Sequence, residues 1–257
     1  MRKKQTRLLI VATAVVLGLL MIATQFNQSV HYVNPGTLNR HFFWRGGWYY
    51  DGTDWAYVRG GRKVTGRQRI NGVQYRFRAD GRQVLPYQVN RQYELAASQG
   101  SNQRATPKYI ILHDVGSQAT GQQAASYMQR SANSNQAYTN FIVGNGGTVY
   151  LMKQPGTVSW GAGTTANQNA PVQIELGQTS SAATFRQDYQ AYVALARDMA
   201  GKYKLPLTLD QGGAGKKGIK SHRWVSQHIW GDHQDPYEYL ARFGVTKQEL
   251  ATDLAGR

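Results

Sequence analysis

Hydrophobic and polar positions follow two different periods in the C-terminal part of the chain. Short apolar runs bounded by glycine and polar residues predict strands at 109–113, 139–143, 148–152 and 172–176. Segments with helical periodicity predict helices at 120–132 and 183–204, and shorter ones at 221–229, 236–243 and 246–254. Strands interleaved with helices are typical of an α/β layer fold. We therefore expect a β-sheet flanked by helices.

The N-terminal segment has a different pattern. A positively charged cap, residues 1–7, precedes an uncharged apolar run of 17 residues from Leu8 to Thr24. A helix that is apolar on every side is rarely a core helix of a small domain. The run falls between the apolar core of a signal peptide and a membrane span of roughly 20 residues. We expect residues 1–30 to form a hydrophobic signal peptide or membrane anchor, with the rest of the chain exported.

Residues 42–86 are crowded with aromatic residues and glycines. Sliding this region against itself gives a match at a period of twenty residues, in which Trp55-Ala-Tyr57 aligns with Tyr75-Arg-Phe77. Gly-Gly and Asp-Gly pairs between the aromatic runs predict hairpin turns. Because one short repeat cannot bury its own apolar face, we expect stacked β-hairpins here. The polar residues 87–107 are then interpreted as a linker.

The segments 47–52 and 72–81 resemble the choline- and glucan-binding repeats of wall-associated proteins. In those repeats aromatic rings stack on sugars or enclose quaternary ammonium groups. The resemblance implies these wall-binding residues: Trp48, Trp55, Tyr57, Tyr75 and Phe77. The alternative is a structural β-extension whose aromatic residues are its own core.

Composition restricts the chemistry and the partners. The chain has no cysteine, which excludes disulfides, thiolate nucleophiles and cysteine-ligated zinc. Its 30 Lys and Arg residues outnumber 14 acids, giving a formal net charge of +16. A surface this basic favours a polyanionic partner: nucleic acid, anionic lipid or an anionic cell wall. Since the N-terminus predicts export, nucleic acid is the weaker choice and anionic wall polymer the stronger one.

Candidate metal ligands gather near the C-terminal end. Residues 218–236 hold three of the six histidines, His222, His228 and His233, and two acids, Asp232 and Asp235. A catalytic zinc site needs three such ligands from different parts of the chain and one open position. Far upstream, His113 ends an apolar strand. Between them, Glu175 is the single acid in the apolar run 172–177 and is either a buried ion-pair partner or a catalytic group.

The segments 108–116, 172–177 and 218–236, in this order, resemble the zinc-dependent N-acetylmuramoyl-L-alanine amidases that cut peptidoglycan. The resemblance implies a catalytic domain over 108–257, built on a central mixed β-sheet with a zinc site in a surface groove. It also implies Zn²⁺ ligands at His113, His222 and Asp235. Asp232 and His233 compete with Asp235 for the third place, and His228 is expected to be structural.

The same resemblance implies the remaining roles. Glu175 corresponds to a glutamate that acts as general base, and His233 to a histidine that lines the site and stabilises the oxyanion. Two segments depart from the family pattern: residues 160–163 read Trp-Gly-Ala-Gly where Trp-His-Ala-Gly is usual, and 139–141 read Thr-Asn-Phe where Ala-His-Phe is common. Both departures concern the groove wall, so Trp160 and Asn140 are expected to contact substrate.

The sequence thus predicts an exported enzyme of the extracellular space or cell wall. It would hydrolyse the amide bond between N-acetylmuramic acid and L-alanine, as an autolysin or lysin does. The alternatives are a peptidoglycan-binding protein without catalysis, and a zinc endopeptidase that cuts the stem peptide. Peptidoglycan is the expected partner in all three cases.

Overall fold

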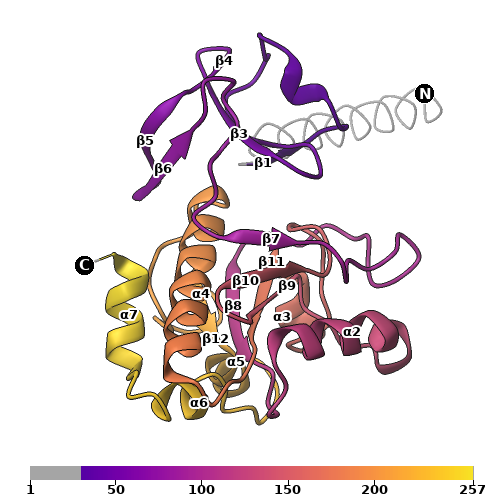
Figure 1. Cartoon of the computed structure of the whole chain (residues 1–257), viewed down its shortest axis with the longest axis vertical. Helices are drawn as coiled ribbons and strands as arrows, with labels where there is room; N and C mark the ends of the chain where they lie inside the picture. The colour runs from indigo at the N-terminus through magenta and orange to yellow at the C-terminus, as the bar shows by residue number, and fades with distance from the viewer. Residues whose placement is uncertain (1–29, 257) are drawn as a thin grey trace, which may run out of the picture. The chain divides into compact units, whose positions relative to one another are not determined.

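The computed structural model describes residues 30–256, which divide into two compact units at residues 64 and 65 (Figure 1). The first unit is a four-stranded sheet in the order β1-β2-β3-β4. Its elements are β1 (Val30–Tyr32), η1 (Thr37–Asn39), β2 (Gly47–Tyr50), β3 (Trp55–Arg59) and β4 (Arg62–Lys63). Leu38, Phe43, Tyr49, Ala56 and Val58 pack together as the core of this unit.

The predicted signal peptide or anchor, residues 1–30, lies outside the described residues except for Val30. Among residues 30–256, none of the helices combines the length and the apolar character that crossing a membrane requires.

The second unit is built on a six-stranded mixed sheet in the order β12-β8-β11-β9-β10-β7. Its strands are β7 (Gln88–Asn90), β8 (Tyr109–Asp114), β9 (Phe141–Gly144), β10 (Thr148–Leu151), β11 (Val172–Leu176) and β12 (Gly218–Ser221). The strands β12, β8, β11 and β9 are parallel, and β10 is antiparallel to β9. The expected central mixed sheet is confirmed. The linker prediction for 87–107 is wrong in one respect, because residues 88–90 pair with β10 as an edge strand.

Helices cover both faces of this sheet. They are α2 (Gly121–Asn135), α3 (Thr164–Gln168), α4 (Ala182–Lys202), α5 (His222–His228), α6 (Tyr237–Ala241) and α7 (Lys247–Ala255). Helix α2 packs its alanines against Ile142 of β9, and α5 packs Trp224 against Tyr109 of β8. The alternate strand residues are fully buried on the opposite face, where the long helix α4 lies against the sheet.

Two glycines allow α2 to begin directly on the sheet. A Cβ atom on Gly121, the first residue of α2, would lie 2.8 Å from the Cα atom of Gly144 at the end of β9. Side chains at either position would push the helix away from the strand ends. Thr120 and Gln123 form a capping box that fixes the first turn at this place.

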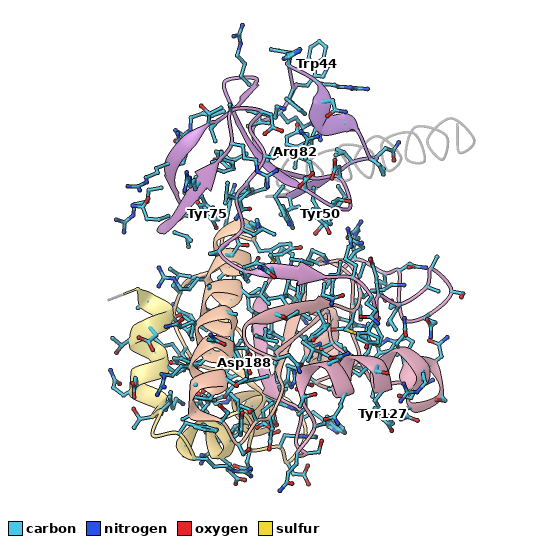
Figure 2. All side chains as sticks on the ribbon, viewed as in Figure 1. Trp44, Tyr50, Tyr75, Arg82, Tyr127 and Asp188 are labelled. Atoms are coloured by element: carbon cyan, nitrogen blue, oxygen red, sulfur yellow. The ribbon has the colours of Figure 1, made fainter. Side chains whose placement is uncertain are left out.

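The twenty-residue period does not produce a single stack of hairpins. Its second half, β5 (Gly66–Ile70) and β6 (Val73–Phe77), is a two-stranded sheet of the second unit. There the Tyr75 hydroxyl donates to the Asp198 carbonyl of α4 at 3.1 Å, and the Asn71 amide donates to the Gly201 carbonyl at 2.7 Å. Tyr75, labelled in Figure 2, therefore serves as a packing residue on α4.

Candidate active site

Parallel strand pairing places two of the predicted site residues side by side. His113 of β8 is the register partner of Glu175 of β11. Side chains alternate between the faces of a strand, so Gln173, two residues before Glu175, points to the same face. The Gln173 Oε1 atom accepts a hydrogen bond from His113 Nε2 at 2.9 Å. On this face α2 packs over β9 and β10, while α5 packs over β8. The site lies at the carboxyl ends of β8 and β11.

His222 is positioned by the start of helix α5. Ser221 is the N-cap residue, and its Oγ accepts a hydrogen bond from the Trp224 amide at 3.0 Å. Ser221 is itself held by Asp210, whose carboxylate accepts its amide at 2.7 Å and its hydroxyl at 2.8 Å. These bonds fix the first turn of α5, so the His222 imidazole projects from a rigid position toward β8.

Asp235 reaches the same point from the loop that follows α5. Its carbonyl accepts from the Arg223 amide at 3.0 Å, and its Oδ2 accepts from the Asp114 amide at 3.3 Å. Tyr237, two residues later, donates its hydroxyl to Asp210 at 2.5 Å. The side chain of Asp210 is 2% exposed. Asp210 thus anchors the segments that carry His222 and Asp235.

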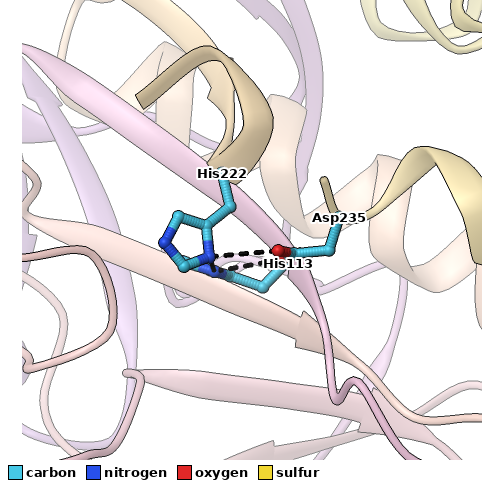
Figure 3. Close-up of side chains that lie close together, drawn as sticks. All are labelled: His113, His222 and Asp235. Carbon is cyan, nitrogen blue, oxygen red and sulfur yellow. Dashed lines mark hydrogen bonds and ion pairs between the residues drawn. The ribbon is translucent and has the colours of Figure 1, made fainter. Parts of the chain in front are cut away.

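The three predicted metal ligands converge (Figure 3). The Nδ1 atoms of His113 and His222 are 3.0 Å apart. Asp235 Oδ2 lies 3.5 Å from His113 Nδ1, and Asp235 Oδ1 lies 3.2 Å from His222 Nδ1. One ligand atom from each residue lies within 4.8 Å of the others. Two imidazoles and a carboxylate are a donor set that suits Zn²⁺ and leaves one position open. The residues present therefore fit the implied metal.

The charges of Asp235 and His222 also fit a cation. Burial opposes ionisation of Asp235, but hydrogen bonds from His113 and His222 outweigh it and hold the Asp235 pKa below its usual range. Burial, followed by the nearby His113, lowers the pKa of His222 to about 4. At neutral pH the site therefore offers a carboxylate and a neutral imidazole at His222, the protonation states that bind a metal.

Glu175 is a buried carboxyl beside this cluster. Its side chain has an Oε2 atom with no hydrogen-bond partner among the residues that the structure describes. Burial raises its pKa to about 8, with His113 opposing the rise and Asp235 and Asp114 adding to it. A desolvated carboxyl with an oxygen that has no partner in the described part of the chain is poorly explained as an ion-pair partner. It is available for proton transfer near neutral pH.

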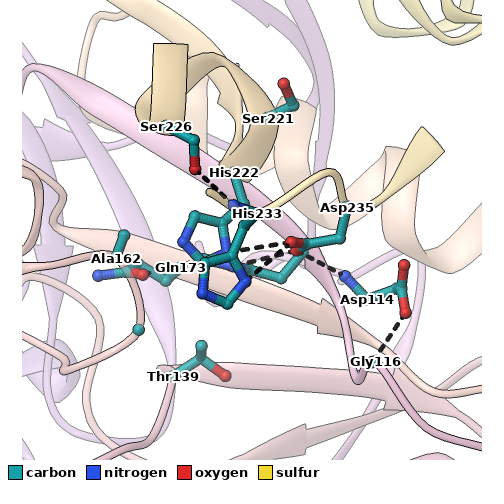
Figure 4. A network of polar contacts seen from close by, with 12 residues as sticks. Asp114, Gly116, Thr139, Ala162, Gln173, Ser221, His222, Ser226, His233 and Asp235 are labelled. Carbon is teal, nitrogen blue, oxygen red and sulfur yellow. Dashed lines mark hydrogen bonds and ion pairs between the residues drawn. The ribbon is translucent and has the colours of Figure 1, made fainter. Parts of the chain in front are cut away.

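His233 covers the solvent side of the cluster. Its ring stacks on His222 with 3.9 Å between centroids, and its Nδ1 lies 3.5 Å from Asp235 Oδ1. The side chain is 52% exposed, in contrast to the buried His113 and His222. Ser226 accepts the His233 amide at 2.9 Å, as Figure 4 shows. His233 is therefore accessible to a ligand that approaches the site.

The sequence model of one protein family, described as N-acetylmuramoyl-L-alanine amidase, matches residues 103–238, more than half of the chain. The chain belongs to this amidase family. An endolysin of Listeria phage A511 is 43% identical over 150 residues, which are 57% of this chain and 43% of that protein. A lytic amidase of Streptococcus pneumoniae phage HB-3 is 31% identical over 155 residues, 57% of this chain and 46% of that protein. The chain spans less than half the length of these two curated relatives.

Among solved structures, the hydrolase AmiA of Staphylococcus aureus in complex with its ligand gives a TM-score of 0.58 at 22% identity. The match covers 67% of this chain and 82% of AmiA. At this identity the likeness shows the fold, which is the α/β amidase fold with a central sheet and flanking helices.

In this amidase-family chain, a cavity of about 570 Å³ opens beside the ligand cluster. His222 and His233 are part of its lining, as is the half-buried Trp160, which is expected to contact substrate. Trp230, which the sequence analysis did not select, also lines it with 63% of its surface exposed. Its place next to His228 and Asp232 in the histidine-rich segment is a signal that could have identified it.

The Asn140 side chain lies inside the second unit. We expected its side chain to contact substrate, but it is fully buried. Its Oδ1 accepts from the Gln173 amide at 2.9 Å and from the Ser159 hydroxyl at 3.1 Å, and its Nδ2 donates to the Thr157 carbonyl at 3.2 Å. The side chain joins β11 to the 157–159 segment inside the unit. It therefore supports the groove wall without touching the groove.

Neither rival for the third ligand position, Asp232 or His233, belongs to the converging group, although His233 stacks on His222. Asp232 is exposed and is not part of the converging group. His228 stacks on Trp224 with 4.6 Å between centroids, and its Nδ1 bonds to the Trp224 carbonyl at 2.9 Å. Gln173 and Asp210 were missed by the sequence analysis, since an amide in an apolar strand and an acid in a loop carry no pattern of their own.

Proposed function

We propose that the chain is a zinc-dependent hydrolase that cleaves the amide bond between N-acetylmuramic acid and L-alanine in peptidoglycan. The observation that carries the proposal is the convergence of His113, His222 and Asp235 beside the buried Glu175, whose Oε2 has no hydrogen-bond partner among residues 30–256. Family membership supports the reaction class. The two curated relatives are named as an endolysin and a lytic amidase, which supports the cell wall as substrate.

His113, His222 and Asp235 would hold the zinc ion, and Zn²⁺ would supply the Lewis acidity that polarises a carbonyl and activates water. Glu175 then takes the proton of the attacking water and delivers a proton to the departing alanine nitrogen. His233, exposed above the cluster, donates a hydrogen bond to the developing oxyanion. Trp160 and Trp230, which both line the cavity beside the cluster, contact the substrate.

Product analysis separates this function from the two alternatives. Digestion of purified peptidoglycan should release free lactyl carboxyl groups on muramic acid and N-terminal L-alanine. New amines within the stem peptide would identify an endopeptidase instead. Binding to the wall without any new chain ends would identify a non-catalytic binding protein.

Substitution of the ligands tests the metal assignment. His113→Ala, His222→Ala and Asp235→Ala should each lose stoichiometric zinc, measured by elemental analysis, together with hydrolysis. Asp232→Ala is the matched control and should keep both. If Asp235→Ala retains one zinc per chain, the third ligand is assigned wrongly.

We further propose that the protein acts outside the cell, with residues 1–30 as signal peptide or anchor, and that residues 42–86 contribute to wall binding. The five aromatic residues named for this role are not free to stack on a sugar. Trp48 packs edge-to-face on Trp55 and Tyr57, and Tyr75 packs on Phe77. In the first unit the exposed aromatic pair is Phe42 and Trp44, with Trp44 94% exposed (Figure 2).

The β5–β6 hairpin supports an anionic wall polymer as a second partner. Arg67 lies directly opposite Arg76 in this hairpin, and Arg69 is on the same face. All three are exposed, and none forms an ion pair within the described part of the chain. Like charges directly opposite each other destabilise a hairpin. A polymer of phosphodiesters would relieve this repulsion and is the partner that the patch fits.

A further inference from the structure

Gln173 links the metal site to the backbone of the groove wall through a buried chain of hydrogen bonds. Its Oε1 accepts from His113 Nε2 at 2.9 Å, and its Nε2 donates to Asn167 Oδ1 at 2.8 Å. The same Asn167 oxygen accepts the amides of Gly161 at 3.2 Å and Ala162 at 2.8 Å. Gln173 and His113 are almost completely buried, and Ala162 lies beside Gln173 in Figure 4.

The bonds to residues 161 and 162 decide which atom donates and which accepts in every hydrogen bond of this series. The backbone N–H groups of residues 161 and 162 can only donate, so the atom of Asn167 that faces them is its oxygen. That oxygen can only accept, so Gln173 must present its NH₂ group to it. A second N–H of the same group points to the Ser159 carbonyl at 3.5 Å. The remaining atom of the amide, the oxygen, therefore faces His113.

An oxygen facing His113 Nε2 requires a proton on that nitrogen. A neutral imidazole has one N–H, so the lone pair is then on Nδ1, the atom that faces His222 and Asp235. Asp235 Oδ2, 3.5 Å from Nδ1, is a competing acceptor that would draw the proton onto Nδ1. The Gln173 bond is shorter and holds the proton on the far side of the ring.

We propose that Gln173 is a positioning residue that sets the metal-binding tautomer of His113, with its own orientation dictated through Asn167 by the 161–162 backbone. The inference rests on the proposed zinc function. It gives a reason for glycine at position 161: a Cβ atom there would lie 2.6 Å from Gln173 Oε1 and 3.0 Å from Thr139 Cγ2. Any side chain would displace the amide from His113.

The zinc affinity of two Gln173 variants tests the proposal. It is measured on the full chain by competition with a chromophoric chelator. Gln173→Leu removes the acceptor, and loss of such an outer partner costs about 10–100-fold in metal affinity. Gln173→Glu keeps an acceptor for His113 but loses the donor to Asn167. It should keep zinc affinity within about threefold of wild type while unfolding at lower denaturant. A merely structural glutamine would lower stability in both variants and change zinc affinity in neither.

Gln83→Leu is the matched control. Gln83 is also a buried glutamine, but it donates to Asp198 at 3.2 Å and does not contact the ligand cluster. Its loss should lower stability and leave zinc affinity unchanged. Gly161→Ala should weaken zinc binding in the wild-type background and have little effect in Gln173→Leu, because both changes break the same bond. Additive losses of zinc affinity in the double variant would contradict the proposed series of hydrogen bonds.

The tautomer itself is visible by ¹⁵N NMR of the histidine rings in the chelator-treated wild type. We expect His113 to carry its proton on Nε2, with a shift toward Nδ1 in Gln173→Leu. A proton on Nδ1 in the wild type would overturn the proposal. Failure of the proposed function has another signature: a wild type that neither binds Zn²⁺ nor digests wall, whatever the tautomer of His113.

Discussion

Replacing Glu175 by glutamine should make the protein more stable and less active at once. Glutamine resembles the protonated carboxyl in shape and charge but cannot accept a proton at neutral pH. Positioned acid–base groups contribute about 10²–10⁴-fold in rate, so hydrolysis should fall by that factor. Glu175 is buried, and its Oε2 has no hydrogen-bond partner within residues 30–256. The substitution by glutamine therefore removes no favourable contact of that atom.

The gain in stability depends on pH with a definite sign. Burial raises the pKa of Glu175 from the ordinary 4.5 to about 8. Below pH 4.5 the residue is protonated in both the folded and the unfolded protein, so its shifted pKa does not lower the free energy of unfolding. Between the two values the unfolded chain is ionised and the folded one is not, so folding must take up a proton. The cost grows by about 1.36 kcal/mol per pH unit, or roughly 3 kcal/mol at pH 7, and stops growing above pH 8.

Urea unfolding at pH 5, 6, 7 and 8 measures this directly, on chelator-treated protein so that a bound cation does not shift the carboxyl. Glu175→Gln should gain on the wild type steadily from pH 5 to pH 8. Glu238→Gln, an exposed acid in α6, is the control and should differ from wild type by a few tenths of a kcal/mol at every pH.

Three results would refute the reasoning. A constant difference between variant and wild type across this pH range would mean that Glu175 is ionised and satisfied in the folded protein. Full hydrolysis by Glu175→Gln would remove it from the mechanism. Loss of stability with retained turnover of the folded fraction would identify a structural residue.

Three further changes have distinct expected outcomes. Asp210→Ala should destabilise the protein by about 3 kcal/mol, because buried donors lose a charged partner, and should weaken zinc binding; calorimetry showing normal zinc affinity would refute its anchoring role. Trp230→Ala should raise KM about 5–30-fold, equivalent to 1–2 kcal/mol of lost stacking, with kcat unchanged; a lower kcat alone would place Trp230 elsewhere. Changing Arg67, Arg69 and Arg76 to Gln should reduce sedimentation with phosphodiester-rich wall polymer at low salt and stabilise the hairpin. Equal loss of DNA binding would indicate a general polyanion surface.

The sequence by itself predicted most elements of the second unit and the candidate metal ligands. Apolar runs with period 2 and longer runs with helical periodicity identified β8, β11 and α4, because burial of one face imposes that spacing on any chain. The absence of cysteine restricted the candidate zinc ligands to histidine and carboxylate. The family resemblance then selected His113, His222 and Asp235, and the structure places these three together.

Only the tertiary structure decided what surrounds them. Gln173 meets His113 across 60 positions of sequence, and Asp210 joins Ser221 to Tyr237 across a loop and a helix. No periodic pattern or fixed spacing in the sequence predicts either contact, since each depends on strand register and on where a loop returns to the sheet. Asn140 was assigned to the groove for the same reason: its sequence context suggested the groove wall, but hydrogen bonds to β11 and to the 157–159 segment hold its side chain inside the unit. The local pattern of apolar and polar residues indicates which face of a segment is buried. The hydrogen-bond partner of a buried polar group depends instead on how distant segments pack together.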